Sequence, residues 1–108
     1  MDIKIDRLQS RYGLKQVTAP VKTIRRSKKK NKKYEVTFLD GTKLDFGDTR
    51  YQHYKDRTKY KYYKKDDHLN LDRRKSYLAR ASQIKDKNGN LTRNNPKSPN
   101  FYSLRLLW

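Results

Sequence analysis

The sequence predicts a small α+β fold. A β-hairpin is expected at about residues 33–47, packed by a helix at about 71–84 and by a short C-terminal helix at 99–108. Three observations support these elements: two β-type runs flank an Asp-Gly pair, apolar residues recur at helical spacing, and a Ser-Pro pair opens an apolar tail. With 108 residues and no cysteine, the chain fits one small domain held together by packing alone.

The first third of the chain predicts an extended basic arm over residues 1–33, in front of a small α+β domain at 34–108. The arm contains 12 basic and two acidic side chains, and its cations are almost continuous from Lys28 to Lys33. An added strand of the sheet at 21–25 is an option that the pattern leaves open. We expect the cationic run to contact phosphates, with a solvated charge cluster as the alternative.

The run KYEVTFLDGTKLDFG predicts the register of the hairpin. A two-residue Asp-Gly loop would put the apolar side chains of the two strands on opposite faces. A three-residue loop at 39–41, with its glycine in the left-handed region, instead pairs Val36 with Leu44 and Tyr34 with Phe46. This register directs five side chains toward the core: Tyr34, Val36, Phe38, Leu44 and Phe46.

The segment after the hairpin mixes basic and aromatic residues. Asp48 is a candidate N-cap for a short helical turn over 49–56. Residues 57–65, RTKYKYYKK, alternate lysine with tyrosine and predict an exposed loop or edge strand. Tyrosine is enriched at protein interfaces, so we expect a protein contact here, with base stacking as the alternative. The interface tyrosines are Tyr51, Tyr54, Tyr60, Tyr62 and Tyr63.

The predicted helix at 71–84 has Asn70 as its N-cap and Asp72 in its first turn. Five apolar residues share one face of this helix: Leu71, Tyr77, Leu78, Ala81 and Ile84. Arg74 falls in the middle of the face. Because a bare buried charge is costly, we expect Arg74 to extend toward solvent or to meet a carboxylate or phosphate.

The C-terminal segment predicts a helix with Ser98 as its cap and Pro99 at its first position. Phe101, Leu104 and Trp108 recur at helical spacing. We expect them to form an apolar plug that docks on the hairpin or on a neighbouring protein.

The composition favours a polyanionic partner over catalysis. Lys and Arg number 29 against 11 acidic residues, for a net charge of +18. The two histidines, His53 and His68, are 15 residues apart, and the glycines never cluster. Asp66-Asp67-His68 could belong to a metal-dependent nuclease, but no second acidic motif follows at a useful spacing, and Asp67 and His68 are interpreted as turn or capping residues. We therefore expect no enzymatic activity, no cofactor and no metal. No apolar run approaches the roughly 20 residues of a membrane span, so we expect no membrane partner.

Nucleic acid is the expected partner, with DNA as the first choice. Basic residues interleaved with aromatic ones are typical of binding without sequence readout. The expected nucleic-acid-binding residues are Arg25, Arg26, Lys28, Lys29, Lys30, Lys32, Lys33, Lys59, Lys61, Arg73, Arg74 and Arg80.

Three stretches, KKYEVTFLDGTKLDFGDTRYQHYKD, DDHLNLDRRKSYLARAS and FYSLRLLW, resemble a family of short basic proteins of unknown function from large DNA viruses and tailed phages. One departure is Ala81, where the resemblance would place a histidine. The resemblance implies a minor structural protein of a virion, present in the host cell during assembly, that binds a capsid or other particle protein and nucleic acid. A stand-alone nucleic-acid-binding protein and a ribosome-associated basic protein are the alternatives.

Overall fold

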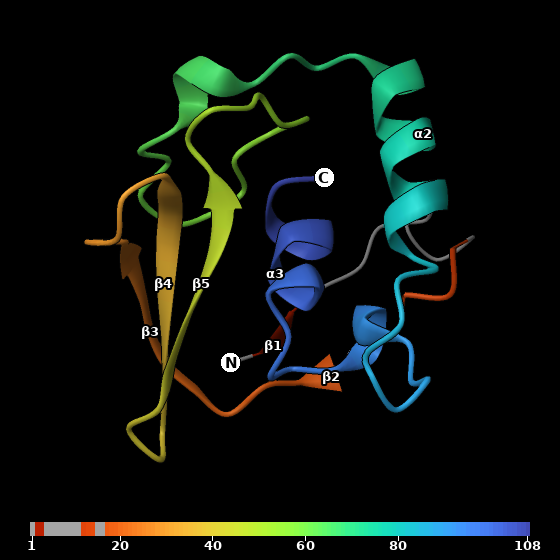
Figure 1. Ribbon diagram of the computed structural model, residues 1–108. Helices are drawn as coiled ribbons and strands as arrows, with labels where there is room; N and C mark the ends of the chain where they lie inside the picture. The colour runs from red at the N-terminus through yellow and green to blue at the C-terminus, as the bar shows by residue number, and fades with distance from the viewer. Residues whose placement is uncertain (1, 4–11, 15–16) are drawn as a thin grey trace.

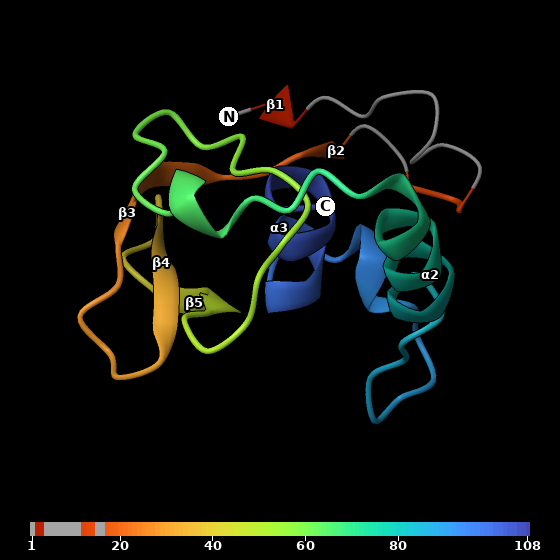
Figure 2. The same cartoon turned by 90° about the horizontal axis from the view of Figure 1, so that it is seen from above.

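The computed structural model describes residues 2–3, 12–14 and 17–108, which form a small α+β fold in three layers (Figures 1 and 2). The antiparallel sheet has the strand order β3-β4-β5, with bounds Val21–Arg26, Lys32–Phe38 and Lys43–Asp48. Helix α3 (Pro99–Leu106) lies between this sheet and helix α2 (Leu71–Ala81). The predicted fold class is confirmed.

Shorter elements complete the fold. Strand β1 (Asp2–Ile3) pairs antiparallel with β2 (Val17–Thr18). Two 3-10 helices follow the sheet and α2 respectively: η1 (Lys64–Asp66) and η2 (Thr92–Asn94).

Much of the predicted basic arm belongs to the sheet. Strand β3 pairs antiparallel with β4 over its length, so the optional strand is present and the predicted boundary at residue 33 does not divide the fold. Ala19 and Val21 are buried, and Ile24 packs against the same core. These few apolar contacts are enough to hold β3 in place, while its long cations project to solvent and obscure the strand pattern. Residues 1, 4–11 and 15–16 of the predicted arm lie outside the described residues.

The hairpin has the predicted register. Val36 pairs with Leu44 and Tyr34 pairs with Phe46. Gly41 has a φ of +88°, and its N–H donates to the Phe38 carbonyl at 3.0 Å, closing the three-residue loop. Because the register fixes which side chains face inward, Tyr34, Val36, Phe38 and Phe46 are all buried and Leu44 is half-buried.

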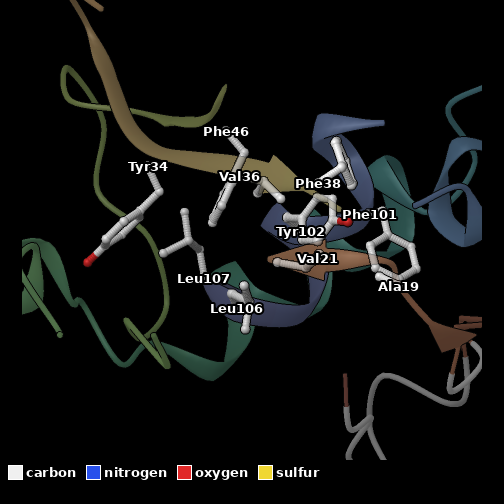
Figure 3. Close-up of a cluster of buried hydrophobic side chains, with 10 residues drawn as sticks. All are labelled: Ala19, Val21, Tyr34, Val36, Phe38, Phe46, Phe101, Tyr102, Leu106 and Leu107. Carbon is white, nitrogen blue, oxygen red and sulfur yellow. The ribbon is translucent and has the colours of Figure 1, made fainter. Parts of the chain in front are cut away.

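Helix α3 is the centre of the core. Figure 3 shows Phe101, Tyr102, Leu106 and Leu107 packed against side chains of the sheet. On its other side, Leu104 packs with Leu78 and Ala81 of α2. A helix buried on both sides is expected to be apolar nearly all round. The C-terminal segment therefore docks on the hairpin, which is one of the two predicted positions; the other was a neighbouring protein.

Helix α2 begins as predicted and ends early. The Asn70 side chain accepts a hydrogen bond from the Arg73 N–H, as expected of an N-cap. The helix ends at Ala81, and Leu71 and Ile84 are exposed, so these two were wrongly placed on the buried face. The Ile84 carbonyl instead accepts from the N–H and the hydroxyl of Thr92, which folds the chain back at this point.

The predicted helical turn over 49–56 is absent from the described chain, which runs irregularly there. Asp48 still caps a turn, because its carboxylate accepts from the Arg50 N–H at 2.9 Å. The predicted exposed loop at 57–65 is a loop that leads into η1.

Candidate nucleic-acid interface

Exposed cations lie on two segments that contact each other where Arg26 packs on Tyr62 and Tyr63. The first segment is the end of β3, the turn at 27–31 and the start of β4; the second is the loop at 57–65. Together they form a surface that we call the basic face. Its members are Arg25, Arg26, Lys28, Lys29, Lys30, Lys32, Lys59, Tyr60, Lys61, Tyr62, Lys64 and Lys65, all of them exposed.

An aromatic stack joins the two segments. The Arg26 guanidinium lies 4.4 Å from the centroid of the Tyr62 ring, which stacks on Tyr60 with centroids 5.3 Å apart and planes at 18°. Tyr60 is 53% exposed and Tyr62 is 43% exposed. Arginine and tyrosine faces of this kind accept nucleic-acid bases.

A buried carboxylate holds the loop in place. Asp56 accepts from the Tyr34 hydroxyl, from the Thr58 N–H at 2.9 Å and from the Tyr63 N–H at 3.1 Å. The Tyr34 hydroxyl in turn accepts from the Tyr62 N–H at 3.0 Å. Burial and the bond to Asp56 raise the pKa of Tyr34 above its usual range. The loop that carries the exposed tyrosines is therefore anchored to the sheet.

The positive charge is only partly neutralised by the sheet's own acids. On the outer face of the sheet, the Lys29 ammonium lies 3.3 Å from the Asp45 carboxylate. The Lys43 ammonium lies 3.8 Å from the Glu35 carboxylate. Ser27 also donates to Asp45, at 2.5 Å. Each pair joins an exposed lysine to a largely buried carboxylate, and these acids are outnumbered by the neighbouring cations.

Lys33, expected to bind nucleic acid, is buried. Its ammonium donates to the Tyr51 carbonyl at 2.9 Å and lies 2.7 Å from His53 Nδ1. His53 Nε2 lies 2.6 Å from Asp67, which also accepts from the Asp56 N–H at 2.8 Å. The prediction for Lys33 is therefore wrong: in strand β4 its side chain turns inward and becomes a structural cation.

The same contacts define the state of His53. Nδ1 accepts from the Lys33 ammonium and Nε2–H donates to the Asp67 carboxylate, so the ring is neutral. Burial, reinforced by the Lys33 charge, lowers the pKa of His53. Both ring nitrogens are used inside the protein, so the ring has no nitrogen left for a substrate.

Arg74 is also buried, and the expectation of a phosphate contact there is wrong. Its Nε donates to the main-chain oxygen of Trp108 at 2.7 Å. Its guanidinium lies 4.5 Å from the centroid of the Tyr54 ring. The sequence predicts that this cation extends to solvent or meets a carboxylate or phosphate; its partner is instead a main-chain oxygen of the C-terminal segment.

The predicted protein-interface residues fall into three groups. Phe101 and Leu104 are fully buried in the core, so they are unavailable to a partner and this prediction is wrong for them. Tyr54, Tyr63 and Trp108 are half-buried. Tyr51, Tyr60 and Tyr62 are exposed.

Arg73 and Arg80 lie apart from the basic face, at a cleft of about 630 Å³ between α2, the end of β5 and the C-terminal segment. Tyr51, Tyr77 and Trp108 line the same cleft. The predicted cations therefore divide between two surfaces.

Sequence reasoning missed several residues of these surfaces. Lys64 and Lys65 belong to the basic face, and the run RTKYKYYKK contained the signal for them. The structural roles of His53, Asp56 and Asp67 depend on contacts between distant segments, which no local pattern reveals.

Among the described residues, no helix is long and apolar enough to cross a membrane, and no group of three or more acidic, histidine or cysteine side chains could hold a metal ion. Comparisons with protein-family models, with curated proteins and with solved structures gave no match.

Proposed function

We propose that the protein binds single-stranded nucleic acid, with DNA as the first choice, without reading its sequence. The basic face contacts the phosphates, and the rings of Tyr60 and Tyr62 stack on bases. Neither contact carries a base code, because every phosphate is alike and every base has a π-face.

The observation that supports this proposal best is the stack of Arg26, Tyr62 and Tyr60 among the exposed cations. A plain cationic surface would attract duplex and single strands alike. Exposed rings held at stacking distance add a contact that only unpaired bases can make fully. The rings are also presented by an anchored loop, so little conformational entropy is lost on binding.

The test compares two double variants by fluorescence anisotropy, with a single-stranded oligonucleotide and with a duplex of the same length. Tyr60→Ala/Tyr62→Ala should weaken single-strand binding about tenfold or more, since stacking contributes roughly 1–3 kcal/mol per base. Duplex binding should change little. Tyr60→Phe/Tyr62→Phe is the matched control: it keeps the ring faces and should retain the affinity.

If the alanine pair binds single strands as tightly as the unaltered protein, or weakens both forms equally, the stacking role is excluded. Both tyrosines are exposed, so the variants should fold, and circular dichroism checks this.

The resemblance to basic proteins of large DNA viruses and phages supports a place for this binding inside a particle, next to a capsid or other particle protein. Mass spectrometry of purified particles tests that part of the proposal. Co-sedimentation of the chain with ribosomes, and its absence from particles, would favour the ribosome-associated alternative instead.

A further inference from the structure

The cleft beside α2 combines three features that are separate from the basic face. It has a volume of about 630 Å³, an aromatic wall and a cationic rim. None of the basic-face residues lines it. The cleft is therefore a second candidate binding site, separate from the basic face.

The aromatic wall is formed by Tyr77 and Trp108. Their rings are nearly parallel, with planes at 7° and centroids 3.9 Å apart, and both side chains are half-buried. Trp108 is further held by the His68 ring at 5.2 Å and by the bond from Arg74 to its main-chain oxygen. The two rings therefore cover one face of each other, and a planar ring can pack only on an outer face or along the edges of this fixed pair.

The cationic rim is formed by Arg73 and Arg80, which lie seven residues apart on α2 and are both exposed. Arg73 Nη1 donates to the Gln52 side chain at 3.0 Å, and the Arg80 guanidinium lies 5.7 Å from the Tyr77 ring centroid. Guanidinium groups bind phosphate well because they offer several N–H donors in one plane.

The cleft is lined by further polar groups, among them the exposed side chain of Asp72 next to Arg73. Lys33 lines it, but its ammonium is already bound to the Tyr51 carbonyl and to His53 and lies 3.8 Å from the Asp66 carboxylate, so it makes no direct contact with a ligand. Asp48 also lines it, and its carboxylate forms an ion pair with the Arg50 guanidinium at 2.7 Å. Ser76 and Ser103 bring hydroxyl groups that can pair with polar ring edges.

We infer that this cleft binds one nucleotide, with its base packed on the outside of the Tyr77–Trp108 pair and its phosphate at Arg73 and Arg80. The ligand is either a free nucleoside phosphate or one unstacked nucleotide of a bound strand. The inference does not rest on the proposed function, because free nucleotide binding needs no part of the basic face.

Trp108 is the sole tryptophan of the chain, so its fluorescence reports on the cleft directly. Titration of the full chain with dAMP should give saturable quenching. Arg73→Ala/Arg80→Ala should weaken dAMP binding about tenfold or more, through loss of two charge-assisted contacts. Adenosine, which has no phosphate, should bind more weakly than dAMP. Its affinity should be the same for the unaltered protein and for Arg73→Ala/Arg80→Ala.

The matched control is Lys28→Ala/Lys30→Ala, which removes the same charge from the basic face and should leave dAMP binding unchanged. Its defect should appear only in strand binding, so failure of this inference and failure of the proposed function are distinguishable. An oligo(dA) titration distinguishes a free nucleotide from a nucleotide of a bound strand. If a strand nucleotide enters the cleft, the oligonucleotide should quench Trp108, and dAMP should compete with it. Without strand entry, the oligonucleotide leaves Trp108 fluorescence unchanged and the ligand is the free nucleotide.

Three results would overturn the inference. One is the absence of saturable quenching by dAMP at millimolar concentration. Another is equal weakening of dAMP binding by the basic-face control. The third is quenching by an acidic, tyrosine-containing peptide and not by dAMP, which would identify the cleft as a protein contact.

Discussion

Buried polar residues hold together the part of the molecule that has no regular secondary structure. Lys33, His53 and Asp67 form one chain of contacts, and Tyr34, Asp56 and Thr58 form another. Each hydrogen bond supplies a partner to a buried polar group, which would otherwise lose its hydrogen bonds to water at a cost in free energy. Residues 49–70 thus depend on polar contacts where other segments depend on apolar packing.

The neutral state of His53 predicts acid sensitivity. Because burial and Lys33 lower its pKa in the folded protein, the unfolded chain binds more protons below the ordinary value of 6.5. The free energy of unfolding should therefore fall as the pH drops from 7 toward 5. The slope is at most about 1.4 kcal/mol per pH unit for each histidine.

Urea unfolding at several pH values measures this slope. His68 contributes in the same direction, since burial and Arg73 lower its pKa as well. His53→Gln should flatten the slope by removing one contribution, and His68→Gln by removing the other. Identical slopes for the unaltered protein and His53→Gln would show that His53 does not titrate on unfolding.

Sequence reasoning anticipated the polar residues only where the signal is local. Asn70 and Ser98 were predicted as caps, and both accept the expected main-chain hydrogen bond. For Arg74 only its place on the apolar face of α2 follows from the local pattern; its bond to the main-chain oxygen of Trp108 does not. Lys33 ends a cationic run and was therefore predicted on the surface; it is buried by contacts with Tyr51, His53 and Asp66, in a segment distant in the sequence.

At the scale of elements, the contact between β5 and the C-terminal segment depends on Gly47. Its φ is +78°, and a Cβ atom there would lie 3.0 Å from both Leu107 Cδ1 and Lys33 Cβ. The glycine lets the end of α3 approach the sheet closely. It also sets the position of Lys33, one wall of the cleft.

Gly47→Ala should therefore destabilise the fold more than Gly41→Ala does. Gly41 has a similar φ of +88°, but nothing lies within 4 Å of a Cβ atom placed there. The control should cost about 1–2 kcal/mol for the left-handed backbone, and Gly47→Ala roughly 1–3 kcal/mol more for overpacking. Equal shifts in the urea midpoint for the two variants would show that the close approach is unimportant.

The regular elements were predictable because their patterns are local. The Asp-Gly loop and the alternation of apolar residues determined the hairpin register, and Ser98-Pro99 marked the start of α3. The end of α2 was not predictable, since the exposure of Ile84 follows from its bonds to Thr92. Strand β3 was predicted only as an option, because cations occupy three of its six positions.

At the scale of the whole molecule, the apolar and charged parts of the chain are spatially separated. The apolar residues meet around α3, and the cations of β3, the following turn and the loop at 57–65 collect on the basic face. The net charge of +18 opposes the compact state unless an anion reduces it. The sequence predicted the cations of this surface other than Lys64 and Lys65; the contact between Arg26 and Tyr62 required the fold.

The most direct test of the proposed role is the salt dependence of binding to a single-stranded oligonucleotide. If about six basic-face cations each neutralise one phosphate, log affinity should fall against log salt with a slope of about −4. Lys28→Ala/Lys30→Ala should flatten the slope by about 1.4. Lys85→Ala/Lys87→Ala, an equal loss of charge in the exposed turn after α2, should leave it unchanged. A slope near zero, or equal flattening by the two pairs, would contradict a nucleic-acid role for the basic face.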